Sequence, residues 1–252
     1  MALGVDQNNV IYASTNHNGI YKSIDEGVTW TQLQDFGGGC GPMDILFGNN
    51  YSILTVKGFN RGIWSSTGDL FSWQKKVGGF DPNTVTQDIN GNLYAGGNSA
   101  GGKELYKSSD AGATWSKISS LYGVQIIRAD SNGKVFLTEG GNNTLFVSSN
   151  QGTSFTQINT LSLPNSGISY PEDILFTNNK MFITKGQVYY SKDDGANFTQ
   201  LDKITFPTAG IFNYGPGGAP SGNYGDSTNR MEMIGNRLFV ASLDGIKFID
   251  ID

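Results

Sequence analysis

Cysteine, histidine and proline are all scarce in this chain of 252 residues. The single cysteine, Cys40, excludes an internal disulfide and leaves the redox compartment undetermined. A cysteine nucleophile needs a basic partner, and His17 is the only histidine, so Cys40 is interpreted as an incidental residue of a glycine-rich loop. The 7 prolines and the lack of a Gly-X-Y period argue against disorder and exclude a collagen-like chain.

Runs of positive charge and long apolar runs are also missing. The net charge is −5 and the 17 basic residues are scattered, which argues against nucleic acid as a partner. The longest apolar runs are only as long as strands, so we expect no membrane insertion. Residues 1–6 are too short and too uncharged for a signal peptide. We therefore expect either a cytoplasmic protein or a sequence that starts after a removed signal peptide.

What the sequence has in abundance is glycine, with 35 residues, and a repeated octapeptide of the pattern Ser-x-Asp-x-Gly-x-x-Trp/Phe. Good copies occupy residues 23–30, 108–115, 148–155 and 191–198, and Asn replaces Asp in the third of these. A degenerate copy runs from Ser65 to Trp73. The closing aromatic residues fall at 30, 73, 115, 155 and 198, so the repeat length is about forty residues.

A second pattern runs in phase with the octapeptide and consists of an Asn-rich turn followed by a short apolar strand. It occurs six times, for example at residues 8–12, 90–94 and 132–136. Asn-Gly and Asn-Asn tolerate the positive φ that tight hairpin turns require. Each repeat therefore predicts four short antiparallel strands, with the octapeptide between the third and fourth strands. This is the unit of a β-propeller blade.

The repeats predict an all-β fold, a single six-bladed β-propeller formed by residues 1–252. The expected blades span residues 1–38, 39–80, 81–121, 122–163, 164–206 and 207–252. In the sixth repeat, residues 244–250 parallel residues 18–25 and the sequence then stops. We therefore expect the sixth blade to have three strands or to be truncated.

The octapeptide resembles the Asp-box, or BNR repeat, of the propellers of sialidases, sortilin-type receptors, some xyloglucanases and photosystem assembly factors. The resemblance covers about five-sixths of the chain and is specific for architecture, not for activity. It implies a structural hairpin away from the ligand-binding face, in which Asp caps the turn, Gly takes a strained conformation and the aromatic residue packs between sheets. The residues with this expected structural role are Asp25, Trp30, Trp73, Asp110, Trp115, Asn150, Phe155, Asp193 and Phe198.

Two turns imitate the opening of a calcium-binding loop. They begin at Asp88 and Asp130, but the twelfth positions are Ser99 and Gly141 where an EF-hand needs Glu. We interpret both as hairpin turns. No metal site and no cofactor are expected.

Glycoside hydrolysis is the main alternative to a binding function, because the resemblance includes sialidases. Those enzymes use three arginines on the substrate, and this chain has only four, Arg61, Arg128, Arg230 and Arg237. Their Arg-Ile-Pro-like N-terminal motif is absent as well. No catalytic residue is therefore assigned. A hydrolase would need carboxylates that converge in one pocket, drawn from Asp44, Glu139, Glu172 and Asp173.

The expected ligand-binding face lies opposite the octapeptides, where the innermost strands begin. An alignment on the Asn turns places five residue pairs at one level: Met43-Asp44, Thr84-Val85, Ile126-Ile127, Glu172-Asp173 and Arg230-Met231. Two residues deeper it places Ile45, Thr86, Arg128, Ile174 and Glu232. Arg128 and Glu232 are charges on otherwise apolar strands and need partners, either each other as a structural pair or a ligand.

A long Gly/Pro-rich segment, residues 206–226, precedes the sixth repeat, and its aromatic residues suit sugar stacking or a protein contact. A loop folded over the channel mouth with a packing role only is the alternative. The ligand-binding candidates are Asp44, Arg128, Glu172, Asp173, Tyr214, Tyr224, Arg230 and Glu232.

The sequence therefore predicts a non-enzymatic binding or scaffold module with a glycan or protein ligand. The resemblance and the Lys-poor composition favour a secreted or surface-attached bacterial protein. A small sialidase-like or other glycoside hydrolase and a protein-interaction factor of the photosystem-assembly type are the alternatives.

Overall fold

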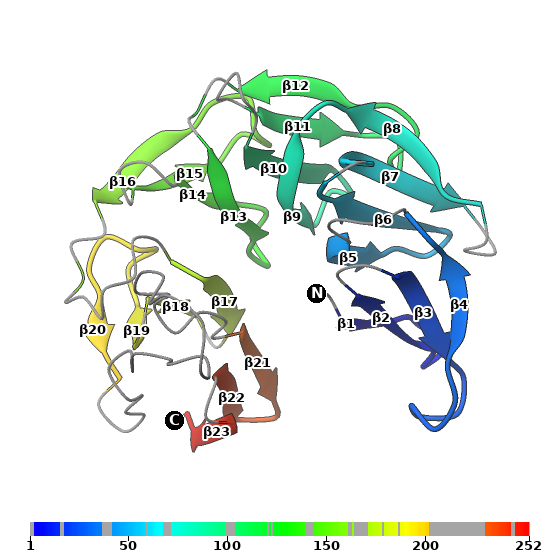
Figure 1. Cartoon of the computed structure of the whole chain (residues 1–252). Coiled ribbons are helices and arrows are strands. Elements are labelled where there is room, and N and C mark those ends of the chain that lie inside the picture. The colour runs from blue at the N-terminus through cyan, green and yellow to red at the C-terminus, as the bar shows by residue number, and fades with distance from the viewer. Residues whose placement is uncertain are drawn as a thin grey trace, which may run out of the picture. The chain divides into compact units, whose positions relative to one another are not determined.

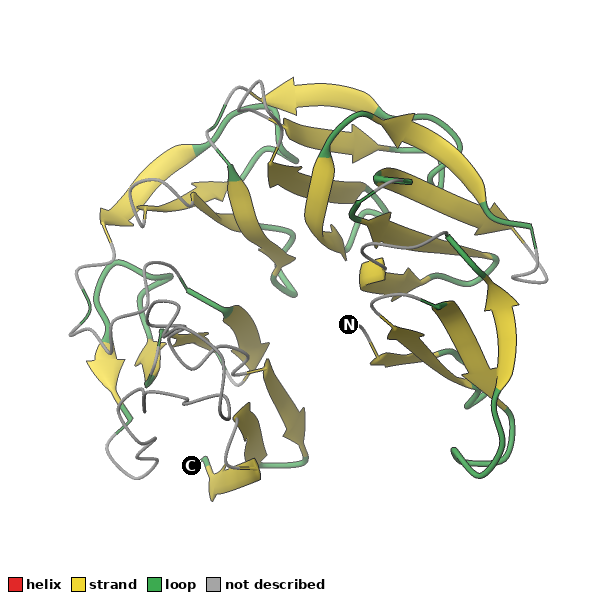
Figure 2. Ribbon diagram, viewed as in Figure 1, coloured by secondary structure: helices red, strands yellow, loops and turns green. Residues whose placement is uncertain are grey.

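All regular structure in the described part of the chain is β-strand. The computed structural model describes residues 3–15, 18–36, 42–58, 60–67, 72–98, 104–119, 121, 123–139, 144–160, 163, 171–177, 179–185, 187–201, 230–242 and 245–251. Figure 2 shows strands and loops but no helix in this part of the chain. None of the described residues therefore belongs to a helix long and apolar enough to cross a membrane.

The strands form six small antiparallel sheets in chain order (Figure 1). Sheet one contains β1 (Leu3–Val5), β2 (Ile11–Thr15), β3 (Gly19–Ser23) and β4 (Thr31–Gln34). Sheet two contains β5 (Pro42–Phe47), β6 (Tyr51–Val56), β7 (Gly62–Thr67) and β8 (Gln74–Gly78). Sheet three contains β9 (Asp81–Gln87), β10 (Leu93–Asn98), β11 (Glu104–Ser108) and β12 (Ser116–Ser119).

The other three sheets follow the same order. Sheet four contains β13 (Val124–Ala129), β14 (Val135–Glu139), β15 (Thr144–Ser148) and β16 (Thr156–Thr160). Sheet five contains β17 (Asp173–Thr177), β18 (Lys180–Thr184), β19 (Val188–Ser191) and β20 (Thr199–Gln200). Sheet six contains only β21 (Arg230–Ile234), β22 (Arg237–Ser242) and β23 (Gly245–Asp250).

These sheets are the blades of a six-bladed β-propeller, which confirms the predicted fold class. In each sheet, strands adjacent in the chain pair with each other, and the sixth sheet has three strands as expected. The chain divides into two compact units, residues 1–141 with 147–156 and residues 142–146 with 157–252, and each is described by itself below. The prediction of a single domain stays a prediction.

In sheets one, three and four, an aspartate holds the turn between the first and second strands. The Asp88 carboxylate accepts the N–H groups of Asn90 and Asn92, both at 2.9 Å, and the Tyr94 hydroxyl at 2.9 Å. Burial and the contact with Asp88 raise the pKa of Tyr94. Asp6 does the same for its own turn and accepts the Tyr12 hydroxyl at 3.1 Å. Both are hairpin turns whose acceptors are already used by the turn itself.

Each of the four good octapeptides forms the same hydrogen-bonded turn between the third and fourth strands of its sheet. In the third sheet, Asp110 Oδ1 accepts the Ser108 hydroxyl at 2.7 Å and the Thr114 N–H at 2.9 Å. The Ser108 hydroxyl oxygen accepts the Gly112 N–H at 2.9 Å. The same bonds recur around Asp25, Asn150 and Asp193. The serine and the aspartate thus satisfy backbone donors that a tight turn leaves unpaired.

Backbone strain is concentrated in the same turns. The octapeptide glycines Gly27, Gly112, Gly152 and Gly195 all have φ between 78° and 90°. The residue before each glycine also has a left-handed backbone conformation, although it carries a side chain. These residues are Glu26, Ala111, Gln151 and Asp194, with φ of 55° to 57°. The turn therefore holds two successive residues in a conformation that L-amino acids disfavour.

The octapeptide aromatics join cores between successive sheets. Trp73 is 7% exposed and belongs to one cluster with Tyr12 and Ile20 of the first sheet. Trp115 packs on the cluster that contains Ile53 and Ile63 of the second sheet. Phe155 and Phe198 are half-buried.

Trp30 differs from the expected packing. Its side chain is 42% exposed, and its indole N–H donates to the Gly27 carbonyl at 3.0 Å. Each of the two packed tryptophans above lies on the preceding sheet, and the first sheet has no preceding sheet in its own unit.

Candidate functional site

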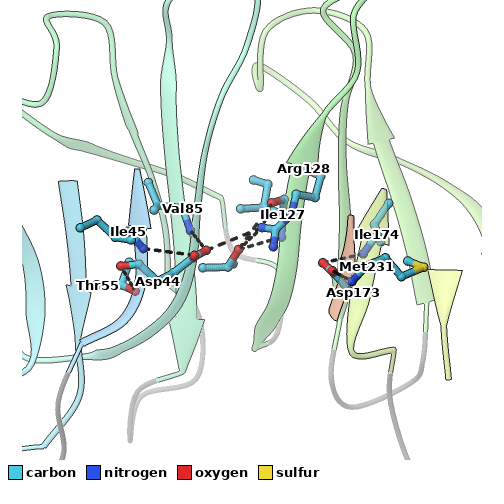
Figure 3. Close-up of polar contacts among 10 residues, drawn as sticks. Asp44, Ile45, Thr55, Val85, Ile127, Arg128, Asp173, Ile174 and Met231 are labelled. Atoms are coloured by element: carbon cyan, nitrogen blue, oxygen red, sulfur yellow. Dashed lines mark hydrogen bonds and ion pairs between the residues drawn. The ribbon is translucent and has the colours of Figure 1, made fainter. Parts of the chain in front are cut away.

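Asp44, on the innermost strand β5, joins two sheets of the first unit. Its Oδ1 accepts the N–H of Ile45 at 3.1 Å, and its Oδ2 accepts the N–H of Val85 on β9 at 3.1 Å (Figure 3). β9 is the edge strand of its sheet, so its outward N–H groups have no neighbouring strand. The carboxylate supplies the acceptor that such a donor lacks.

Asp173 does the same in the second unit. This buried residue begins β17, and its Oδ1 accepts the Ile174 N–H at 3.0 Å. Its Oδ2 accepts the N–H of Met231, on the edge strand β21, at 3.0 Å. Figure 3 shows both contacts. Two candidate carboxylates therefore have one structural task, which is to tie an inner strand to the inner strand of the following sheet.

The pairing of the inner strands corrects the alignment drawn from the sequence. Five inner-strand residues occupy equivalent positions, because each pairs with the equivalent residue of its second strand. The pairs are Asp44 with Thr55, Thr84 with Gly96, Ile126 with Thr138, Asp173 with Thr184, and Arg230 with Ala241. Ile45 and Ile174 consequently lie one residue before the level of Thr86, Arg128 and Glu232. The error arises because the Asn turns differ in length: residues 49–50 form a two-residue turn, whereas residues 89–91 form a three-residue turn.

Arg128 lies against the first of these ties. Its guanidinium donates to the Thr84 hydroxyl at 2.8 Å and to the Ile127 carbonyl at 2.9 Å. The same nitrogen, Nη1, lies 3.7 Å from Asp44 Oδ2, so the two charges form an ion pair. The side chains of Arg128 and Asp44 are 21% and 16% exposed, so both are mostly withdrawn from solvent. Asp44, Thr84 and Arg128 thus form a polar cluster from three successive inner strands.

The expected approach of Arg128 to Glu232 stays a prediction, because the two residues belong to different units. Glu232 is an exposed residue of β21. Successive side chains of a strand point to opposite faces, and Met231 faces the core with Phe182 and Leu238. Glu232 therefore points away from that core and does not converge with Asp173.

The remaining candidates are placed only in part. Glu172 precedes β17, and its N–H donates to the Thr184 carbonyl at 2.9 Å. Glu139 ends β14 and is buried. Arg230 begins β21, but its side chain is outside the described residues, as are Tyr214 and Tyr224.

The sequence argument missed two contributors to this face. Thr84 stands at the level of Asp44 and Asp173, and its hydroxyl lies 3.5 Å from the Ile127 nitrogen on the next inner strand. Arg61 pairs with Asp81 at 3.6 Å, and Asp81 also accepts the Gly58 N–H at 3.3 Å. Correct pairing of the inner strands is the signal that identifies Thr84, whereas no sequence pattern links Arg61 with Asp81.

No three His, Cys, Asp or Glu side chains within the described ranges come together as a metal-ion cluster. The chemistry open to this face is hydrogen bonding and ion pairing. Each oxygen of Asp44 and of Asp173 accepts one backbone N–H group, and in both residues it is Oδ2 that links two sheets.

Residues 103–208 match the Sortilin-Vps10 family model, described as sortilin, neurotensin receptor 3. This match covers less than half of the chain. The chain is a six-bladed repeat propeller whose residues 103–208 are similar to the sortilin family. No curated protein sequence matches it.

Solved structures that resemble this repeat propeller share little sequence with it. YCF48 bound to a D1 peptide has a TM-score of 0.68 at 13% identity, over 100% of this chain and 78% of that one. The GH74 xyloglucanase from Xanthomonas campestris has a TM-score of 0.70 at 15% identity, over 96% and 41%. An extracellular domain of a hybrid two-component system from B. thetaiotaomicron has 0.71 at 13% identity, over 99% and 31%. The repeat propeller thus spans less than half of the last two chains, and the likeness extends to the fold alone.

Proposed function

We propose that this repeat propeller is a binding or scaffold module without catalytic activity. The observation that carries the proposal is the engagement of Asp44 and Asp173. In each, Oδ1 accepts the N–H of the next residue, and Oδ2 accepts an N–H of the inner strand of the following sheet. A retaining or inverting glycosidase needs two carboxyl groups presented to the substrate, with one of them free to donate a proton. Carboxylates that hold the blades together serve the fold instead.

The proposed ligand is a glycan or a protein segment, bound on the face opposite the octapeptide turns. Candidate contacts on this face are the Asp44–Arg128 pair, Glu172, Asp173, Tyr214, Tyr224, Arg230 and Glu232. The similarity to YCF48, which was solved in a complex with a D1 peptide and of which this chain covers 78%, favours a protein ligand. The likeness to the GH74 xyloglucanase keeps a glycan in the proposal. Similarity to an extracellular domain supports a secreted or surface location.

The test is a binding screen of the folded protein against a glycan array and a peptide array. Tyr214→Ala combined with Tyr224→Ala is expected to weaken whichever ligand is found, with little change in melting temperature. Ile24→Ser is the matched control on the octapeptide side, because Ile24 is exposed and serine is the residue at the equivalent positions 109 and 149. Loss of binding in the control with retention in the double variant contradicts the proposed face.

A further inference from the structure

The outermost strand of the sixth sheet, β23, occupies the place of a third strand. Its Ile246 pairs with Ala241, as Val188 of the fifth sheet pairs with Thr184. In the other five sheets the third strand is covered by a fourth, which is β4, β8, β12, β16 or β20. β23 pairs only with β22 among the described residues. Its outer edge therefore presents backbone donors and acceptors without a neighbouring strand.

The octapeptide turn that leads to a fourth strand in other blades has no counterpart here. Ile249 pairs with Leu238, just as Ser108 pairs with Leu93 and Ser191 with Met181. An apolar residue thus stands at the position of the serine whose hydroxyl holds the turn. The serine-held turn that leads to the fourth strand in other sheets is therefore not formed at this position.

A groove lies beside this edge, between the fifth sheet and β23. It holds about 320 Å³ and is lined by Phe182, Tyr190, Leu201, Ile249 and Ile251, with Lys180, Lys192 and Asp250 as its charged residues. Asp250 is engaged by Arg237 at 2.7 Å. The Lys192 ammonium lies 5.8 Å from the centre of the Tyr190 ring and is carried by an exposed residue. The groove is therefore apolar inside, with the Lys192 ammonium at its border.

The first unit shows what fills the corresponding place. Phe182 pairs with Tyr190 as Tyr12 pairs with Lys22, and Leu201 follows β20 as Leu33 follows Gln32. Tyr12 and Leu33 share a cluster with Trp73, which the octapeptide of the second sheet supplies. No described residue of the sixth sheet supplies such an aromatic ring. Phe182 is 1% exposed in a core cluster with Met231 and Leu238, and the half-buried Leu201 and Ile249 remain beside the groove.

We propose that the edge of β23 and this groove bind an extended peptide segment of a partner protein. The segment adds a fourth strand to the sixth sheet, places an aromatic side chain against Leu201 and Ile249, and carries acidic residues toward Lys192. Strand addition gives affinity through main-chain hydrogen bonds, and side-chain pockets give specificity. This surface differs from the face proposed above and does not depend on it.

The probe is a synthetic peptide of residues 23–34 of this protein, which contains an octapeptide, the acidic residues Asp25 and Glu26, Trp30 and a fourth strand. It is expected to bind the intact protein and to slow hydrogen exchange of the amides in 245–251. The same peptide with Trp30→Ala is expected to bind about tenfold more weakly, since the aromatic anchor is lost. The protein variant Lys192→Ser is expected to weaken binding several-fold, because it removes a charge that faces the acidic peptide.

Serine stands at the equivalent octapeptide positions 109 and 149, so Lys192→Ser is expected to fold normally. Lys76→Ser, on the exposed strand β8 of the other unit, is the matched control and should leave binding unchanged. Failure of the peptide to bind overturns the proposal, and so does binding without protection of 245–251. Strong protection of these amides in the free protein means that another part of the same chain covers the edge. Concentration-dependent dimers that hide the edge mean that a second copy is the occupant. Either outcome refutes a partner peptide.

Discussion

At the scale of the residue, the octapeptide aspartates act as turn caps. Hydrogen bonds from the Thr114 side chain and backbone lower the pKa of Asp110 to about 2, and Asp25 and Asp193 behave in the same way. Asn150 shows that an amide can replace the carboxylate. Its Oδ1 accepts the Ser154 N–H at 3.0 Å, and its Nδ2 donates to the Ser154 hydroxyl at 2.8 Å.

Asp110→Ala removes the cap and is expected to destabilise the protein by about 1 kcal/mol, the scale of a lost N-cap. Asp110→Asn is expected to keep nearly full stability at neutral pH, because asparagine reproduces the bonds seen at Asn150. Chemical denaturation of both variants checks this. Equal destabilisation by the two substitutions contradicts the assignment of a capping role.

A comparison of Asp110→Asn with the parent protein at low pH isolates the contribution of the Asp110 charge to stability. A carboxyl whose folded-state pKa lies below its ordinary value of 3.8 contributes stability above that value and loses the contribution as pH falls toward the folded pKa of about 2. Asp110→Asn has no such group, so between about pH 4 and pH 2 it should lose less stability than the parent protein. Denaturation midpoints measured at several pH values in this window decide the point. A parallel loss in both proteins counts against it.

Substitution of two octapeptide glycines by alanine distinguishes the cost of backbone strain from the cost of a packing collision. Gly112 has φ +82°, and a Cβ there collides with Ile53 Cδ1, whereas a Cβ at Gly27, φ +90°, meets only Trp30 at 3.8 Å. Gly27→Ala is expected to cost about 1 kcal/mol from the left-handed conformation alone. Gly112→Ala should cost about 1–3 kcal/mol more, because the core residue Ile53 is displaced. Equal losses in thermal unfolding would show that the contact with Ile53 does not matter.

At the scale of the element, the inner strands are joined by side chains as well as by apolar packing. Asp44 and Asp173 accept N–H groups from edge strands β9 and β21, which pair on one side only. Such carboxylates reproduce, at one point per strand, what a neighbouring strand does along its whole length.

Asp173→Asn is therefore expected to destabilise the protein by about 1–3 kcal/mol, since one of two buried N–H donors loses its acceptor. Glu26→Gln, an exposed change in an octapeptide turn, is the control and should stay within about 0.5 kcal/mol of the parent. The measurement is the free energy of unfolding in denaturant. A neutral Asp173→Asn removes the physical basis of the structural assignment.

Strands and turns could be predicted from the sequence because each repeat carries its own signals. The octapeptide predicts a turn, and the Asn-rich segments predict hairpins. Strand register could not be predicted at the same level, because a turn one residue longer shifts every inner-strand residue to the other face. That shift hid Thr84, which belongs with Asp44 and Asp173. The partner of Arg128 was also out of reach, since Asp44 lies two repeats earlier in the chain.

At the scale of the whole molecule, the repeat defines architecture much more closely than function. Solved structures with this fold include a protein in a peptide complex and a xyloglucanase, all at identities of 13% to 15%. Function on such a fold depends on the residues of one face rather than on the blades. For this chain, the ties made by Asp44 and Asp173 are the basis of the proposed binding function.

The most direct test of that claim is an assay of product release in the sample that is screened for binding. The folded protein is incubated with xyloglucan, with sialylated glycans and with the glycans it retains on the array, and new reducing ends and free sialic acid are measured. We expect no release above the blank from the parent protein. Sustained turnover that disappears in Asp44→Asn or Asp173→Asn, with an unchanged melting temperature, would show that these carboxylates are catalytic and would contradict the account.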